Sequence, residues 1–345
     1  MTNTPSTERV VLITARMEPQ WLERLRNEWP NLRFEKRSPR AGEHIPDELW
    51  HEVEILYMSF ATSLPAPEQA PHLRWVQLYS AGADYISTQP LFQSNVTFTS
   101  ASGLHAVNMA EYILTVMLAW FHRLPNLLQW QQRGQWAPEQ ARQTELLPEE
   151  LRGKTLGVVG YGSIGREVAR LATAFGMRVL AMQRGTDHRD SGFQFAGIGD
   201  PTGTLPERYY SFEQLHTMLG ECDVVLIAVP LTGETRGMFN AAAFQAMKPN
   251  AFLVNIARGG ICDEDDLLHA LRERQIAGAA LDVFKQEPLP SDSPFWHLPN
   301  VFISPHVTGL TPAYDDRAAT IFAENLRRYL AGEPLYNTID KARGY

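Results

Sequence analysis

The chain has 345 residues, of which 44% are hydrophobic and 20% are charged, and this profile excludes intrinsic disorder for most of its length. Its net charge of −8 would repel nucleic-acid phosphates and anionic lipids, so we expect neither a nucleic acid nor a membrane as a partner. The two cysteines, Cys222 and Cys262, fit neither a disulfide framework nor a Cys-x-x-Cys site, and we expect no metal centre. The polar segment 1–8 and the lack of any run of about 18 apolar residues predict a cytoplasmic location.

Short apolar runs alternate with helix-length segments, which is the pattern of parallel sheets covered by helices. Helical or loop stretches such as 19–28 are expected between the first strands. A long apolar helix between Met109 and Trp120, with apolar residues at steps of three and four, is interpreted as a link between two domains. The strands expected in this first part span 10–13, 55–58, 73–78 and 96–99.

The alternation restarts more regularly after position 151. Good helix caps precede the expected helices at Ser211, Asn240 and Asp263, and the helix over 315–330 has an apolar face that we expect to return to the first domain. The expected strands span 155–159, 178–182, 224–229, 251–255, 277–283 and 301–304.

This order predicts an α/β protein with two Rossmann-like or flavodoxin-like domains, each with a parallel sheet, and a cleft between them. The substrate domain would be discontinuous, 1–105 with 311–345, and the dinucleotide-binding domain would be 106–310. The segment near 121–150 carries Trp130 and Trp136 without a strand pattern, and either wraps its own domain or is an arm that packs on a second subunit.

A phosphate-binding turn is predicted at Gly160, Gly162 and Gly165. The three glycines follow an apolar strand and open a helix, which is the context that makes G-x-G-x-x-G specific for a dinucleotide pyrophosphate. The alternative is a structural turn without a ligand.

The end of the next strand indicates which dinucleotide is bound. An acid is expected there for NAD, but this chain has Gln183 followed by Arg184. Arg184, with His188 or Arg189, could pair with a 2'-phosphate, so we favour NADP(H), with NAD(H) still possible. The alternative is that Arg184 is an ordinary surface charge.

Three charged residues follow three later strands, at the sheet edge where ligands bind. Reduction of a 2-oxo acid needs a proton donor, which His306 could be, a carboxylate such as Glu287 to fix its tautomer and favour the imidazolium, and a planar cation such as Arg258 to bind the carboxylate and polarise the carbonyl. Each also has an ordinary interpretation: His306 is one of ten histidines, Glu287 could lie in a surface turn, and Arg258 could form a surface salt bridge.

The segments 157–165, 254–259, 281–284 with 287–288, and 304–309 together resemble the D-isomer-specific 2-hydroxyacid dehydrogenases, and most of all the glyoxylate and hydroxypyruvate reductases. The resemblance implies that Arg258, Glu287 and His306 are the catalytic residues and that Asp282 binds the nicotinamide carboxamide, although Asp282 could instead cap a loop. It also implies a homodimer and a substrate-carboxylate loop formed by Ser80, Ala81, Gly82 and Ala83, opposite Arg258 and His306. The residues expected at the cofactor are Gly160, Tyr161, Gly162, Ser163, Ile164, Gly165, Gln183, Arg184, Val229, Pro230, Leu231, Thr232, Ile256, Ala257, Asp282, His306 and Gly309.

The sequence therefore predicts an NADP-preferring oxidoreductase of small 2-oxo acids, of the glyoxylate or hydroxypyruvate type. Two alternatives stay open: a dinucleotide-sensing module like the corepressors that share this fold, and a phosphite dehydrogenase that uses the same three residues on an inorganic anion.

Overall fold

The computed structural model describes residues 9–37 and 44–344, so the polar segment 1–8 lies outside the described residues. The chain divides into two compact units. Unit 1 comprises Met1–Leu104, Ser191–Phe193 and Thr311–Tyr345, and unit 2 comprises His105–Asp190 and Gln194–Leu310.

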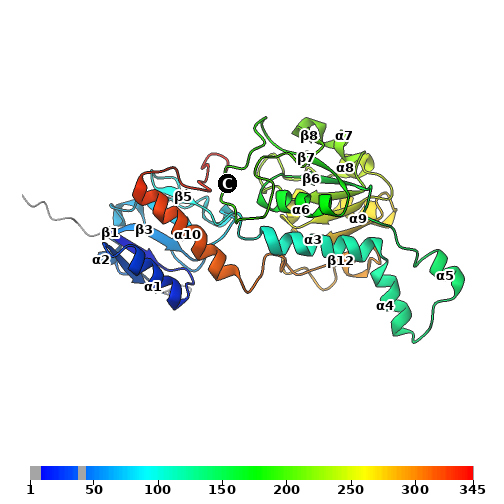
Figure 1. Ribbon diagram of the computed structural model, residues 1–345, viewed down its shortest axis with the longest axis horizontal. Coiled ribbons are helices and arrows are strands. Elements are labelled where there is room, and N and C mark those ends of the chain that lie inside the picture. The colour runs from blue at the N-terminus through cyan, green and yellow to red at the C-terminus, as the bar shows by residue number, and fades with distance from the viewer. Residues whose placement is uncertain (1–8, 38–43, 345) are drawn as a thin grey trace, which may run out of the picture. The chain divides into compact units, whose positions relative to one another are not determined.

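Unit 1 contains a five-stranded parallel sheet in the order β2-β1-β3-β4-β5, the flavodoxin-like order. Helices α1 (Pro19–Glu28) and α10 (Tyr314–Ala331) pack one hydrophobic cluster against one face, and α2 (Asp47–Trp50) contributes to a second cluster on the other face (Figure 1). The strands are β1 (Arg9–Ile13), β2 (Leu32–Lys36), β3 (Val53–Met58), β4 (Trp75–Leu78) and β5 (Thr97–Thr99).

Unit 2 contains a seven-stranded parallel sheet in the order β12-β11-β10-β9-β6-β7-β8. This is the Rossmann order with one further strand, and its direction of winding reverses between β6 and β9. The strands are β6 (Thr155–Val159), β7 (Arg178–Met182), β8 (Arg208–Tyr210), β9 (Val224–Ile227), β10 (Phe252–Asn255), β11 (Gly278–Leu281) and β12 (Val301–Ile303).

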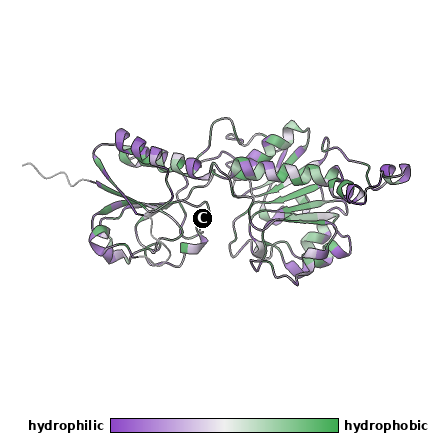
Figure 2. Ribbon diagram, turned by 90° about the horizontal axis from the view of Figure 1, so that it is seen from below, coloured by the Kyte–Doolittle hydropathy of each residue, from purple (hydrophilic) through white to green (hydrophobic). Residues whose placement is uncertain are grey.

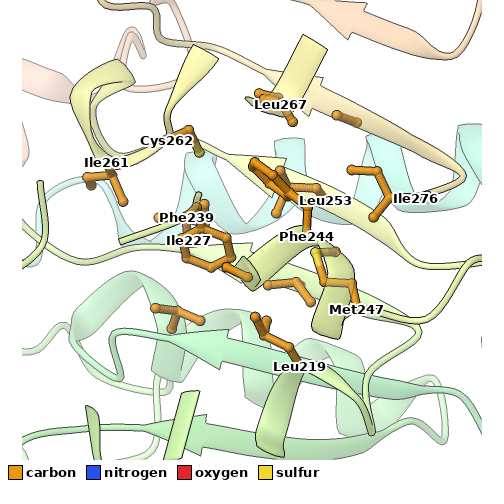
Figure 3. Close-up of a cluster of buried hydrophobic side chains, with 14 of the residues drawn as sticks. Leu219, Ile227, Phe239, Phe244, Met247, Leu253, Ile261, Cys262, Leu267 and Ile276 are labelled. Atoms are coloured by element: carbon orange, nitrogen blue, oxygen red, sulfur yellow. The ribbon is translucent and has the colours of Figure 1, made fainter. Parts of the chain in front are cut away.

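Two hydrophobic clusters cover the two faces of this sheet. Helices α3 (Ala106–Phe121) and α6 (Ser163–Ala174) lie side by side on one face (Figure 1). Helices α7 (Leu215–Leu219), α8 (Ala241–Ala246) and α9 (Glu264–Arg272) enclose the other cluster, in which Phe239, Phe244 and Leu253 point toward one another (Figure 3). The strands are mainly hydrophobic while the flanking helices carry hydrophilic residues as well (Figure 2). Because both sheets are parallel and covered by helices, the prediction of two parallel-sheet α/β domains is confirmed.

Two strands were not expected from the sequence, and both are edge strands. In β2 only Phe34 is buried among polar neighbours, and β8 has three residues of which only Tyr210 is buried. Edge strands carry a weaker apolar signal than central ones.

The segment after α3 forms α4 (Leu124–Gln132) and α5 (Glu139–Gln143), neither of which has a buried residue. Large hydrophobic side chains are exposed along it, among them Leu127, Leu128 and Trp136, the last of which is 88% exposed. In the described part of the chain, no helix is both long and apolar enough to cross a bilayer.

Candidate active site

The glycine turn lies at the point where the unit 2 sheet reverses direction. Gly160 has a φ of +105°, and a Cβ built on it would lie 2.7 Å from the carbonyl carbon of Ala228, just after β9. A Cβ on Gly165 would lie 2.6 Å from the carbonyl oxygen of Gly160, whereas a Cβ on Gly162 would meet nothing within 4 Å. The first and third glycines are therefore required by packing, and the second leaves open space beside the backbone.

This geometry fits a dinucleotide pyrophosphate. Helix α6 begins at Ser163, directly after the open position, so its unpaired N–H groups and dipole favour an anion there. The side chain of Tyr161 is buried and its hydroxyl donates to Asp200 Oδ2 at 2.7 Å, so this residue offers the cofactor only its backbone.

The two residues after β7 are placed where an adenosine ribose would be read. Gln183 Oε1 is buried and accepts no hydrogen bond within the described chain, and the contact of Gln183 with a cofactor stays a prediction. The Arg184 guanidinium lies over the Phe212 ring, 5.0 Å from its centroid, and forms an ion pair with Glu234. Glu234 was not identified from the sequence, because it lies fifty residues further along the chain.

The long connection between β7 and β8 is attached to α6 by a buried arginine. Arg166 is 2% exposed and donates to the carbonyl oxygens of Asp200, at 2.6 Å, and His188, at 2.8 Å. The His188 ring stacks on Tyr209 with centroids 3.5 Å apart. Hydrogen bonds from Tyr161 and two backbone N–H groups outweigh burial and lower the pKa of the Asp200 carboxyl.

The predicted acid and its carboxylate are in direct contact. His306 follows β12 and Glu287 follows β11, and the distance from His306 Nδ1 to Glu287 Oε2 is 2.7 Å. The other oxygen, Oε1, accepts the Phe284 N–H at 3.0 Å, which holds the carboxylate in position. The contact leaves Nε2 as the histidine nitrogen that can exchange a proton with a ligand, and the His306 side chain is 49% exposed.

The backbone of His306 is held in an unusual conformation, with a φ of +53°. Such a φ is uncommon for a residue with a side chain and is found at functional sites when the surroundings impose it. Here the surroundings include Asp282, whose backbone oxygen accepts the His306 N–H at 2.9 Å.

The Asp282 carboxylate is 1% exposed and accepts hydrogen bonds from the segment around His306. The donors are Ser304 Oγ at 2.5 Å, Val307 N at 3.1 Å, and Thr308 N at 3.3 Å and Oγ1 at 2.6 Å. These contacts are those of the loop-capping alternative, and binding of a nicotinamide carboxamide stays a prediction.

Arg258 lies on the loop next to the one that carries Glu287. Asn255, the last residue of β10, shapes its turn by accepting the Ala257 N–H at 3.1 Å and donating to the Arg258 carbonyl oxygen at 3.3 Å. A Cβ on Gly259 would lie 2.0 Å from the carbonyl carbon of Phe284, so the two loops are packed backbone to backbone. All three predicted catalytic residues thus follow neighbouring strands at the carboxyl edge of the unit 2 sheet.

The predicted substrate loop belongs to unit 1, where it follows β4. Ser80 Oγ donates to the Gly82 carbonyl oxygen at 2.8 Å and lies 3.2 Å from the Tyr85 hydroxyl, so the loop is braced by its own side chain. Ala81 and Gly82 are partly exposed and Ala83 is buried.

The other residues expected at the cofactor lie on the loops that follow the strands. Thr232 forms a turn in which its N–H donates to Thr235 Oγ1 at 2.8 Å, and Gly309 packs against His105. The side chains of Val229, Ile256 and Ala257 belong to the hydrophobic clusters of the sheet. Among the described residues no group of His, Cys, Asp and Glu could hold a metal ion.

Comparison with known proteins connects this geometry to a family. A family model described as "D-isomer specific 2-hydroxyacid dehydrogenase, NAD binding domain" matches residues 114–308. The chain is 36% identical over 264 residues to the (S)-sulfolactate dehydrogenase of Chromohalobacter salexigens, covering 75% of this chain and 78% of that protein. It is 34% identical over 266 residues to the glyoxylate reductase of Thermofilum pendens, and the match covers 77% of this chain and 74% of that protein. A D-isomer-specific 2-hydroxyacid dehydrogenase from Xanthobacter autotrophicus, crystallised with NADPH and MES, superposes with a TM-score of 0.77 at 29% identity, covering 98% of this chain and 99% of that one.

Proposed function

The chain belongs to the D-isomer-specific 2-hydroxyacid dehydrogenases, which are NAD(P)-dependent oxidoreductases, and we propose that it is an NADP(H)-preferring reductase of small 2-oxo acids such as glyoxylate or hydroxypyruvate, forming the D-hydroxy acid. The observation that carries this proposal is the contact between His306 and Glu287 at the same sheet edge as the glycine turn. A named glyoxylate reductase at 34% identity supports the substrate class.

A nicotinamide bound beside the glycine turn would supply the hydride for the carbonyl carbon. As the carbonyl oxygen gains negative charge, His306 donates a proton to it from Nε2. Glu287 holds the imidazole through Nδ1 and so orients Nε2 toward the carbonyl oxygen. Arg258 offers a planar pair of donors that matches the substrate carboxylate and polarises the neighbouring carbonyl.

The preference for NADP(H) rests on the residues after β7. No acid stands at position 183, so a 2'-phosphate meets no like charge there, and the Arg184 guanidinium is 35% exposed and able to contact it. The NADPH bound to the Xanthobacter relative supports this choice. Gln183→Asp should shift the ratio of kcat/KM toward NADH by about tenfold or more, and an unchanged ratio would contradict the assignment.

A steady-state assay tests the activity itself. We expect the purified protein to reduce glyoxylate, hydroxypyruvate or 3-sulfopyruvate, the last included because of the sulfolactate relative. His306→Gln should lower kcat by about 10²- to 10⁴-fold, whereas His297→Gln, which changes an exposed histidine of the same unit, should leave it unchanged. Wild-type activity in His306→Gln would remove His306 from the mechanism, and no turnover with any 2-oxo acid would refute the proposed function.

We also propose that the protein is a cytoplasmic homodimer in which the segment 121–150 is the dimerisation arm. The exposed apolar side chains of α4 and the exposed Trp136 support this, since several large apolar side chains exposed in one segment are typical of a surface that a partner covers. Light scattering should give twice the chain mass for the wild type and a lower mass for Leu128→Arg with Trp136→Arg. A monomeric wild type would refute the dimer.

A further inference from the structure

The cation proposed to bind the 2'-phosphate is already paired with an acid of the same unit. Arg184 Nη2 donates to Glu234 Oε2, and both side chains are partly exposed, at 35% and 70%. The guanidinium also lies over the Phe212 ring, 5.0 Å from its centroid. The ring fixes where the guanidinium lies, and the carboxylate accepts from its Nη2 donor.

Glu234 is carried by a rigid turn rather than by a flexible loop. Thr235, its neighbour, is 2% exposed and donates from Oγ1 to the Pro230 carbonyl oxygen at 2.6 Å. The Thr232 N–H donates to the same Oγ1 at 2.8 Å, and the Arg236 N–H closes the turn on the Thr232 carbonyl oxygen at 3.0 Å. The backbone of Glu234 is therefore fixed, and its carboxylate can leave Arg184 only by rotation of the side chain.

A phosphate that approaches Arg184 meets two opposing effects. The guanidinium attracts it through charge-assisted hydrogen bonds, but the Glu234 carboxylate occupies the Nη2 donor and repels a second anion. An exposed ion pair is weak, so the phosphate can displace the carboxylate. After displacement, the carboxylate still lies near the phosphate because its backbone is fixed.

We propose that Glu234 is a specificity-determining residue that competes with the cofactor 2'-phosphate for Arg184 and so limits the preference for NADP(H) over NAD(H). This inference rests on the proposed role of Arg184 in cofactor choice. It predicts that removing the charge of Glu234 strengthens binding of a 2'-phosphorylated adenosine without strengthening binding of one that lacks the 2'-phosphate.

Calorimetric titration with 2',5'-ADP and with 5'-AMP tests this directly, without turnover. Glu234→Gln should lower the dissociation constant of 2',5'-ADP by about 5- to 10-fold and should change that of 5'-AMP by less than about 2-fold. The gain should shrink at high salt, because exposed charges are screened. The matched control is Glu273→Gln, which removes the same formal charge of −1 from the C-terminal end of α9. It should leave the affinity for both ligands unchanged.

Arg184→Gln separates this inference from the proposed cofactor preference. If Arg184→Gln leaves 2',5'-ADP binding unchanged, the preference assigned to Arg184 is wrong. If Arg184→Gln weakens 2',5'-ADP but Glu234→Gln has no effect, or no more effect than Glu273→Gln, only the competition is wrong. In the Arg184→Gln background, the gain from Glu234→Gln should shrink to what direct repulsion between the carboxylate and the phosphate provides, and an undiminished gain there would also overturn the competition.

Discussion

The three glycines of the dinucleotide turn should respond differently to alanine. Gly162 has an ordinary φ of −89° and open space where its Cβ would be, so Gly162→Ala should change the free energy of unfolding by less than about 0.5 kcal/mol. The added methyl group would occupy the space through which a pyrophosphate reaches the backbone. Overpacking of this kind costs about 1–3 kcal/mol, which corresponds to roughly 5- to 150-fold weaker binding.

Gly160→Ala should mainly lower the stability of unit 2. An alanine at a φ of +105° is strained by about 1–2 kcal/mol, and its Cβ would overlap the backbone of Ala228, which adds about 1–3 kcal/mol. A total near 3 kcal/mol should lower the unfolding temperature of unit 2 by roughly 6–12 °C. Gly165→Ala, whose Cβ would lie 2.6 Å from the Gly160 carbonyl oxygen, should also unfold early.

Two measurements on the same samples separate these effects. Thermal unfolding reports packing, and equilibrium titration with NADP⁺ and with NAD⁺ reports the pyrophosphate contact. Gly162→Ala should weaken both dinucleotides by the same factor, since both carry the pyrophosphate. The reasoning would be refuted by a Gly162→Ala protein that binds both dinucleotides as the wild type does, or that unfolds as early as Gly160→Ala.

Three further predictions concern groups that are buried or partly buried. Asp282→Asn should lower the free energy of unfolding in urea by about 2–4 kcal/mol and should lower kcat, because an amide cannot accept from all four donors, and a change under about 1 kcal/mol would contradict this. Burial raises the pKa of the Cys222 and Cys262 thiols to about 12. Iodoacetamide near pH 8 should therefore label the native chain on the order of 10³-fold more slowly than the unfolded chain. Fast labelling of the native protein would contradict the burial of these two thiols. Burial alone would raise the pKa of Asp223, but hydrogen bonds from a backbone N–H and from Lys248 outweigh it and lower the pKa. The stabilisation from this carboxylate should be present above about pH 5 and lost as the pH falls through the lowered pKa, so urea unfolding of Asp223→Asn should depend less on pH in that range than unfolding of the wild type.

The central strands could be predicted because they are buried on both faces. The strand β6 has five buried residues in sequence, and β9 has four, and such runs bounded by turns have few other interpretations. The edge strands β2 and β8 could not be predicted in this way, because one side of each is open and polar residues are tolerated there.

Some contacts of the candidate site could be predicted from the order of the strands, and others could not. The position of His306 and Glu287 after neighbouring strands made their proximity predictable, because the carboxyl ends of parallel strands meet at one edge. The pairing of Arg184 with Glu234 and the anchoring of Asp200 by Arg166 depend on side-chain packing between distant segments. No periodicity or spacing reports such contacts, so only the structure reveals them.

The left-handed backbone of His306 is explained by the hydrogen bonds around it. A residue with a side chain at a φ of +53° is destabilised by about 1–3 kcal/mol, so an unrestrained loop would relax to an ordinary conformation. Asp282 opposes this, because its backbone oxygen accepts from His306 and its carboxylate accepts from residues on both sides of it. Each hydrogen bond to a charged group contributes about 1.5–3 kcal/mol, so two of them are enough to outweigh the strain. The buried aspartate therefore fixes the backbone from which the imidazole reaches Glu287, and a residue at the end of β11 positions the proton donor that follows β12.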